Sequence, residues 1–319
     1  ASHSELVAAL AGTRAVVHLA GRAHRMERAD HAANARRAKG VGRFMAANEA
    51  ADSVMQGPNV EATARLARAA VAAGVERFVF ASSIKIHGEA TAPGRPFRPA
   101  DPPEPHDAYA RSKAAAEAAL IAAAAGTRMQ PVILRLPLVY GAGAGGNFSR
   151  LVDAVAEGRW LPLASIHNRR SLLSLGNLLT AIDAALGAES GAESGAESGA
   201  ESGAEAGAEA GAEAAATPAP LVHPQAHLLA DADAVSTPQL VRAVAAALGV
   251  SPRLVPFPVS WLRLAGAATN RVAAIARLTD SLEADTTSFT AWTGWRPSSF
   301  AIDAAMVDRD SASGRRRRA

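Results

Sequence analysis

The chain has 319 residues, of which 49% are hydrophobic, so it is long enough to bury a substantial core. It contains no cysteine, which excludes disulfides and thiolate metal sites, and its histidines show no metal-ligand spacing. A net charge of only +3, an aromatic content of 4% and the lack of an apolar run of about 18–20 residues argue against a nucleic-acid surface and a membrane span. We therefore expect a soluble, cytoplasmic protein with no metal, nucleic-acid partner or membrane insertion.

Predicted helices and strands alternate in the first part of the chain. A helix over residues 5–11 leads into an apolar strand over 15–19, and residues 29–56 have a helical composition. An amphipathic helix over 59–73 is ended by a glycine and precedes an apolar strand over 78–81. This alternation predicts an α/β fold with a parallel, doubly wound sheet and right-handed connections.

Polar residues follow the strand over 78–81. Ser82 and Ser83 end it, a proline-rich loop is expected over 90–106, and a long alanine-rich helix is predicted over 108–125. Tyr109 and Lys113 lie four residues apart near the start of that helix, so they share one of its faces.

This arrangement suits proton transfer. A lysine within a few ångströms favours the tyrosinate, so we expect Lys113 to lower the pKa of Tyr109 below its usual value of about 10. A serine hydroxyl at the strand end can hydrogen-bond the same substrate oxygen. The three groups together suit removal of a proton from an alcohol while a hydride leaves its carbon, which is oxidation by a nicotinamide cofactor.

The second half of the chain starts with an apolar strand over 131–136 and ends in predicted helices. Residues 188–216 repeat Ala-Glu-Ser-Gly and then Ala-Glu-Ala-Gly, and the recurrent glycine disfavours a stable helix, so we expect an inserted surface segment there. A helix should begin over 235–240, with Pro238 in its first turn. The predicted divisions are an incomplete dinucleotide-binding domain over 1–165, a substrate-binding lobe with returning elements over 166–308, and a disordered basic tail over 309–319.

Several short motifs occur in an order that is typical of one family. They are Val16-Val17-His18-Leu19-Ala20-Gly21, Asn59-Val60-Glu61-Ala62-Thr63, Arg135 to Gly141, Gly146-Asn147-Phe148, Asn168-Arg169-Arg170-Ser171 and Gly294-Trp295-Arg296-Pro297. With these motifs, the chain resembles the extended short-chain dehydrogenases/reductases, specifically the NAD-dependent nucleotide-sugar epimerase/dehydratase group typified by UDP-glucose 4-epimerase. The resemblance implies a Rossmann-like domain with a smaller, mainly helical C-terminal lobe. Because the Gly-x-x-Gly-x-x-Gly turn that normally opens such a fold is not found, it also implies an N-terminally truncated domain.

The resemblance assigns roles to individual residues. It implies that Ser83, Tyr109 and Lys113 are catalytic, with Ser83 chosen over Ser82 by its spacing from the turn at Gly88. The cofactor residues that it implies are Leu19, Ala20, Gly21, Asn59, Ser82, Tyr109, Lys113, Pro137 and Val139. The substrate residues that it implies are Ser83, Leu138, Asn147, Phe148, Leu161, Leu163, Arg170 and Arg277. An arginine suits a diphosphate because its guanidinium can bind two oxygens at once, although each arginine could instead serve a surface ion pair.

The resemblance leaves several reactions to compare. Dehydratases of the group carry Asp-Glu directly after the catalytic hydroxyl residue, and this chain has Ile84-Lys85 there, which disfavours dehydration. We expect an NAD-dependent epimerase that inverts C4 of a UDP-hexose, of the UDP-glucose or UDP-N-acetylglucosamine type, through a 4-keto intermediate in surface-polysaccharide sugar biosynthesis. The alternative is an NAD(P)H-dependent 4-reductase of a UDP-4-keto-6-deoxy-hexosamine. Leu138, where 4-epimerases often have asparagine, leaves the sugar open.

A hypothesis of another class is a non-catalytic, truncated remnant that binds sugar nucleotides. It rests on the missing glycine-rich turn, because the helix N-terminus behind that turn is the main anion site for a dinucleotide. The expected cofactor is NAD, with NADP left open because the residue that discriminates them belongs to the segment not found. The resemblance also implies a UDP-sugar as substrate and a homodimer formed through two helices, one of which carries Tyr109 and Lys113.

Overall fold

The computed structural model describes residues 2–21, 56–92, 94–188, 225–269 and 271–307. Apart from one terminal residue each, the predicted helical segment 29–56 and the repeat at 188–216 lie outside the described residues, as does the whole tail at 309–319. In the described part of the chain, no helix is long and apolar enough to cross a membrane.

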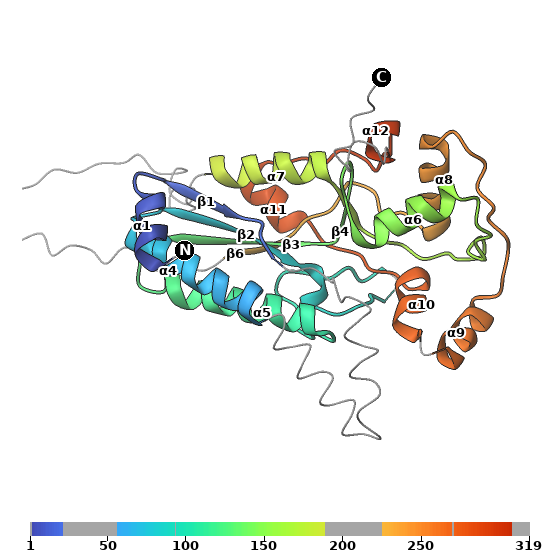
Figure 1. The fold of residues 1–319 in the computed structure, drawn as a ribbon, viewed down its shortest axis with the longest axis horizontal. Coiled ribbons are helices and arrows are strands. Elements are labelled where there is room, and N and C mark those ends of the chain that lie inside the picture. Colours follow the sequence, from blue (N-terminus) through green and yellow to red (C-terminus); the bar gives the residue numbers. More distant parts are fainter. Residues whose placement is uncertain (1, 22–55, 93, 189–224, 270, 308–319) are drawn as a thin grey trace, which may run out of the picture.

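A four-stranded parallel sheet forms the centre of the larger part of the molecule (Figure 1). In spatial order its strands are β1 (Ala15–His18), β2 (Arg77–Ser83), β3 (Gln130–Leu136) and β6 (Gln225–Leu228). Val16 pairs with Phe78, and Val79 pairs with Val132, so the carboxyl ends of the strands lie at the same edge. The predicted α/β class with a parallel, Rossmann-like sheet is confirmed.

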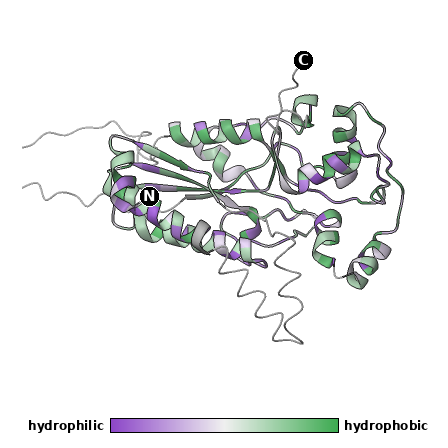
Figure 2. Ribbon diagram, in the orientation of Figure 1, coloured by the Kyte–Doolittle hydropathy of each residue, from purple (hydrophilic) through white to green (hydrophobic). Residues whose placement is uncertain are grey.

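Helices cover both faces of this sheet (Figure 1). On one face lie α1 (His3–Leu10), α4 (Ala62–Ala72) and α5 (Ala108–Ala124), and on the other lie α7 (Leu175–Gly187) and α11 (Thr287–Thr293). Side chains alternate along β2, so Phe78 and Phe80 pack towards α4 and α5, whereas Val79 packs towards α7. A π-helical turn over Gln56–Glu61 leads into α4. Figure 2 shows that α7 is mostly hydrophobic along its length.

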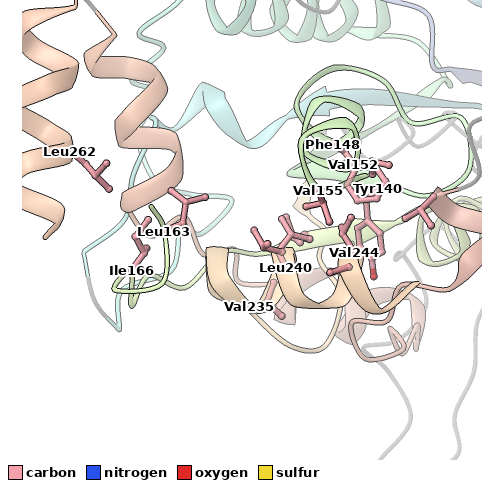
Figure 3. Packing of buried hydrophobic residues seen from close by; sticks show 14 residues of the cluster. Tyr140, Phe148, Val152, Val155, Leu163, Ile166, Val235, Leu240, Val244 and Leu262 are labelled. Carbon is pink, nitrogen blue, oxygen red and sulfur yellow. The ribbon is translucent and has the colours of Figure 1, made fainter. Parts of the chain in front are cut away.

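The smaller part of the molecule has its own core. It contains the paired strands β4 (Leu138–Tyr140) and β5 (Leu172–Ser174) and the helices α6 (Gly146–Ala156), α8 (Thr237–Ala247), α9 (Val259–Ala268), α10 (Val272–Thr279) and α12 (Ala304–Val307). Phe148 and Val152 of α6 lie beside Tyr140 and close to Val244 of α8 (Figure 3). The predicted start of α8 is confirmed, because Ser236 and Gln239 form a capping box there. The domain division at residue 165 stays a prediction.

Candidate active site

Ser83 and Tyr109 meet at the carboxyl end of β2. Ser83 is the last residue of the strand, and its Oγ accepts a hydrogen bond from the backbone N–H of Lys85 at 3.3 Å, at the start of the 3-10 turn over Ile84–Ile86. Tyr109 lies in the first turn of α5, which packs against β2, and its phenol is hydrogen-bonded by the Ser83 side chain. The structure therefore brings together the two hydroxyls that the sequence predicts to act on one substrate oxygen.

Burial dominates the acidity of the Tyr109 phenol. Desolvation raises its pKa above the usual value of 10, the hydrogen bond with Ser83 lowers it, and the negative charge of Asp107 raises it. The sequence argument expected Lys113 to bring this pKa below 10, and for the protein alone that expectation is wrong. The reason is that removing the phenol from water disfavours the phenolate more than its neighbours favour it.

Lys113 lies one helical turn after Tyr109 and is 4% exposed. Its Nζ donates a hydrogen bond to the carbonyl oxygen of Ala81 at 2.8 Å and lies 4.6 Å from the centroid of the Phe80 ring. Burial lowers the pKa of Lys113 to about 8, although the charge of Glu117 acts to raise it. Lys113 therefore loses its proton at a lower pH than an exposed lysine does, while it is still mostly protonated at neutral pH.

Gly21, Asn59 and Lys113 meet beyond the carboxyl end of β1. A Cβ at position 21 would lie 2.9 Å from Lys113 Nζ and 3.3 Å from Asn59 Oδ1, so a larger residue would push these two polar groups away from the backbone. Asn59 is buried, and its Nδ2 donates a hydrogen bond to Ser112 Oγ at 2.8 Å. A lysine ammonium has three N–H donors, of which Ala81 accepts one. This group of donors and acceptors fits the ribose of a nicotinamide nucleotide.

The other predicted cofactor segments follow the ends of the sheet strands. Leu19 and Ala20 continue β1 and are exposed, Leu19 by 53%. Pro137 is buried between β3 and β4, and Leu138 and Val139 are half-buried in β4. These segments lie at the carboxyl ends of parallel strands, where open α/β sheets bind their ligands. Contact between these residues and a cofactor stays a prediction.

Ser82 belongs to a buried polar network that the sequence analysis missed. Its Oγ donates a hydrogen bond to Glu117 at 2.5 Å, and Glu117 accepts two hydrogen bonds from Arg135, at 2.7 and 3.1 Å. Arg135 also contacts His87 Nε2 at 2.9 Å. The Ser82 hydroxyl therefore donates its hydrogen bond to Glu117, and the contact of Ser82 with a cofactor stays a prediction. An arginine inside an apolar strand needs a buried partner, and that signal was present in the sequence.

The two predicted diphosphate arginines converge. Arg170 is half-buried, and its Nη1 donates a hydrogen bond to the backbone oxygen of Asp280 at 2.9 Å. Burial lowers the pKa of Arg170, the charges of Glu89 and Asp280 raise it, and the charge of Arg277 lowers it. Arg277 is therefore close enough to repel Arg170, and Glu89, six residues after Ser83 in the sequence, is close enough to attract it. An anion placed between the two arginines would relieve their repulsion.

The remaining predicted substrate residues differ in their surroundings. Asn147 is exposed and accepts a hydrogen bond from Arg150 at 2.8 Å, and Leu161 is half-buried. Phe148 and Leu163 are 2% and 6% exposed in the core of the smaller part of the molecule. Their side chains are fixed by that core, and the contact of these positions with the substrate stays a prediction.

Comparison with known proteins identifies the family of the chain. Residues 2–196 match the model of the NAD dependent epimerase/dehydratase family. The chain belongs to this family. It is also 33% identical over 244 residues to UDP-glucose 4-epimerase of Vibrio cholerae, an alignment that covers 75% of this chain and 64% of the relative. The chain thus spans just under two thirds of the length of that relative.

Solved structures of nucleotide-sugar enzymes share the fold. UDP-glucuronic acid 4-epimerase from Bacillus cereus, in complex with NAD, superposes with a TM-score of 0.63 at 14% identity, covering 98% of this chain and 78% of that one. A dTDP-glucose 4,6-dehydratase from Streptomyces venezuelae gives a TM-score of 0.59 at 18% identity, covering 96% and 76%. Because both an epimerase and a dehydratase match at such low identity, these structures identify the fold and not the reaction.

Proposed function

We propose that this protein is an NAD-dependent epimerase that inverts C4 of a UDP-hexose through a 4-keto intermediate. The observation that carries the proposal is the hydrogen bond between Ser83 and Tyr109, with Lys113 buried one turn away at the same edge of the sheet. The 33% identity to a UDP-glucose 4-epimerase supports epimerisation over reduction.

Tyr109 is the proposed acid and base. It would take the proton of the C4 hydroxyl during oxidation and return it to the C4 oxygen during reduction. Ser83 already hydrogen-bonds the phenol, so a substrate oxygen that contacts Tyr109 can also contact Ser83. Lys113 would supply positive charge one helical turn away, which favours the phenolate when the amine is protonated.

The residues that fit the cofactor are Gly21, Asn59 and Lys113. The chemistry that NAD would supply when bound is to accept a hydride from C4 and to return it to the opposite face of the sugar. The glycine at position 21 keeps the backbone against Asn59 and Lys113, and their polar atoms would hold the ribose hydroxyls in a fixed position.

Arg170 and Arg277 are proposed to bind the diphosphate of the UDP-sugar. Two guanidinium groups that repel each other gain most from an anion between them, and their planar donors match phosphate oxygens. Binding at this remote group would leave the sugar ring free to turn between the two hydride transfers, which inversion at C4 requires.

Dehydration is not supported by the residues after Ser83. Ile84 is 1% exposed, and Lys85 is paired with the carboxylates of Asp107 and Glu89. These positions therefore hold an apolar side chain and a neutralised ammonium instead of the acid pair that removes water in dehydratases.

The test compares two reactions of the same purified protein. With UDP-glucose or UDP-N-acetylglucosamine and a trace of NAD, ¹H NMR should detect the C4 epimer with no net accumulation of NADH. Consumption of added NAD(P)H by a UDP-4-keto-6-deoxy-hexosamine, without any epimer, would select the reductase instead. Calorimetric titration with NAD, done first, shows whether the chain binds its cofactor, and a chain that binds NAD yet performs neither reaction would refute the proposal.

Two wider expectations belong to this proposal. A homodimer through α5 is expected from the family resemblance, as is a role in surface-polysaccharide sugar biosynthesis. Sedimentation velocity tests the first, and a monomer at micromolar concentration would contradict it.

A further inference from the structure

Lys85 forms a charge cluster with two carboxylates beside the proposed catalytic pair. Its Nζ is paired with Asp107 Oδ2 and, at 2.6 Å, with Glu89 Oε1. The Lys85 side chain is 19% exposed, and those of Asp107 and Glu89 are 25% and 27% exposed, so the cluster is largely shielded from water. Shielded pairs of this kind are screened less by salt than surface pairs are.

The pair of Lys85 and Asp107 connects the two elements that position the catalytic hydroxyls. On one side, the backbone N–H of Lys85 donates to Ser83 Oγ at 3.3 Å, so Lys85 belongs to the turn that orients Ser83. On the other side, Asp107 is the N-cap of α5, and its Oδ1 accepts a hydrogen bond from the backbone N–H of Ala110 at 2.7 Å. One salt bridge therefore joins the Ser83 turn to the first turn of the Tyr109 helix.

Asp107 also acts on Tyr109 through its charge. It lies two residues before Tyr109, and its negative charge raises the pKa of the phenol. Asp107, the N-cap of α5, acts on the Tyr109 phenol by its charge, and Lys113 follows one turn later on α5. On the facing turn, Lys85 is paired with both Asp107 and Glu89. Lys85 contacts Asp107 directly, so its ammonium offsets the charge that opposes ionisation of Tyr109.

We propose that Lys85 is a positioning residue for Tyr109, which holds the Ser83 turn against the start of α5 and neutralises Asp107 so that the phenol can release its proton. The effect of Lys85 on catalysis rests on the proposed function. Its effect on the ionisation of Tyr109 can be measured without substrate. At position 85, dehydratases of the group carry an acidic residue. This chain has a lysine there, and we propose that its charge acts on the neighbouring Tyr109.

The composition of the chain makes the measurement direct, because it has only two tyrosines. Tyr140 donates a hydrogen bond to Asp231 at 2.7 Å, and burial together with that contact raises the pKa of Tyr140. Protein labelled with ¹³Cζ-tyrosine should therefore give two resonances, which a Tyr140→Phe variant assigns. The midpoint of the Tyr109 titration is then followed up to the pH at which circular dichroism first reports unfolding.

The variants form a double-mutant cycle. Lys85→Met should raise the Tyr109 midpoint by about 0.5–1 pH unit, and Lys85→Arg should restore it, since arginine keeps the positive charge. Asp107→Asn should lower the midpoint while keeping a residue that can cap α5. In the Asp107→Asn background, the effect of Lys85→Met should fall to less than half, because the salt bridge that holds the Lys85 ammonium at the start of α5 is gone.

Glu89→Gln is the matched control. It removes the other partner of Lys85 and leaves the pair with Asp107, so it should not raise the Tyr109 midpoint. An unchanged midpoint in folded Lys85→Met, or an equal shift with and without Asp107, would overturn the proposal. Because these titrations need no substrate, their result holds even if C4 inversion is not found. If the wild-type protein inverts C4 but Lys85→Met leaves the Tyr109 midpoint unchanged, the role of Lys85 is refuted and the proposed function is not.

Discussion

Tyr109 is the residue on which the proposed chemistry depends, because its phenol carries an exchangeable proton and is hydrogen-bonded to Ser83. Tyr109→Phe should lower the rate of C4 inversion by about 10²–10⁴-fold, because phenylalanine fills the same space but carries no proton. Tyr140→Phe is the control: it removes a buried hydroxyl bonded to Asp231, so it should lower the melting temperature and preserve inversion. Both quantities can be measured on the same preparations, and wild-type turnover by Tyr109→Phe would contradict the role.

Lys113 should make stability depend on pH. Its folded pKa of about 8 lies below the usual value of 10.5, so between these pH values the unfolded chain binds more protons than the folded one. The free energy of unfolding should therefore gain up to about 3 kcal/mol from this group as pH rises from 8 to 10.5. Lys113→Met should lose that gain together with the activity, and urea unfolding at pH 7.5, 9 and 10 measures it. Equal pH slopes for the two proteins would show that Lys113 keeps its proton.

At the scale of elements, the turn between β4 and α6 depends on Gly141. This residue has a φ of 143°, and a Cβ there would lie 3.0 Å from Leu175 Cβ, at the start of α7. Gly141→Ala should lower the free energy of unfolding by about 1–3 kcal/mol through backbone strain and this contact. Gly145→Ala, at a position with open space and a φ of −89°, should cost less than about 1 kcal/mol. Equal losses in denaturant unfolding would contradict this account of the turn.

The elements around the site were predicted from local patterns, and the contacts between elements were not. The strand that ends at Ser83 and the helix that carries Tyr109 follow from apolar runs and spacing, which are properties of neighbouring residues. The commitment of Ser82 to Glu117, like the burial of Phe148, depends on which elements pack together. The predicted direction of the Tyr109 pKa shift was wrong for the same reason, because desolvation depends on the packed site and not on the spacing to Lys113.

At the scale of the whole molecule, Arg277 on α10 is the residue through which the smaller part of the molecule is proposed to contact the diphosphate. Arg277→Met should raise the KM for the UDP-sugar by roughly tenfold with a smaller change in kcat, because the diphosphate is bound alike in the ground state and the transition state. Arg263→Met is the control: this arginine is 62% exposed in an ion pair with Asp280, so its loss should leave KM unchanged. Steady-state kinetics of the two variants decide between a binding role and a surface role for Arg277.

Isotopic tracing in D₂O tests the central claim most directly, namely that C4 of the sugar is oxidised and reduced again by the same hydride while Tyr109 carries the proton. The protein is incubated in D₂O with UDP-glucose and a trace of NAD, and the C4 epimer is isolated and examined by ¹H NMR. We predict an epimer that retains its full C4 proton signal, and at least about 10²-fold slower formation of the epimer by Tyr109→Phe under the same conditions. Deuterium at C4, or an equal yield of epimer from Tyr109→Phe, would contradict the account.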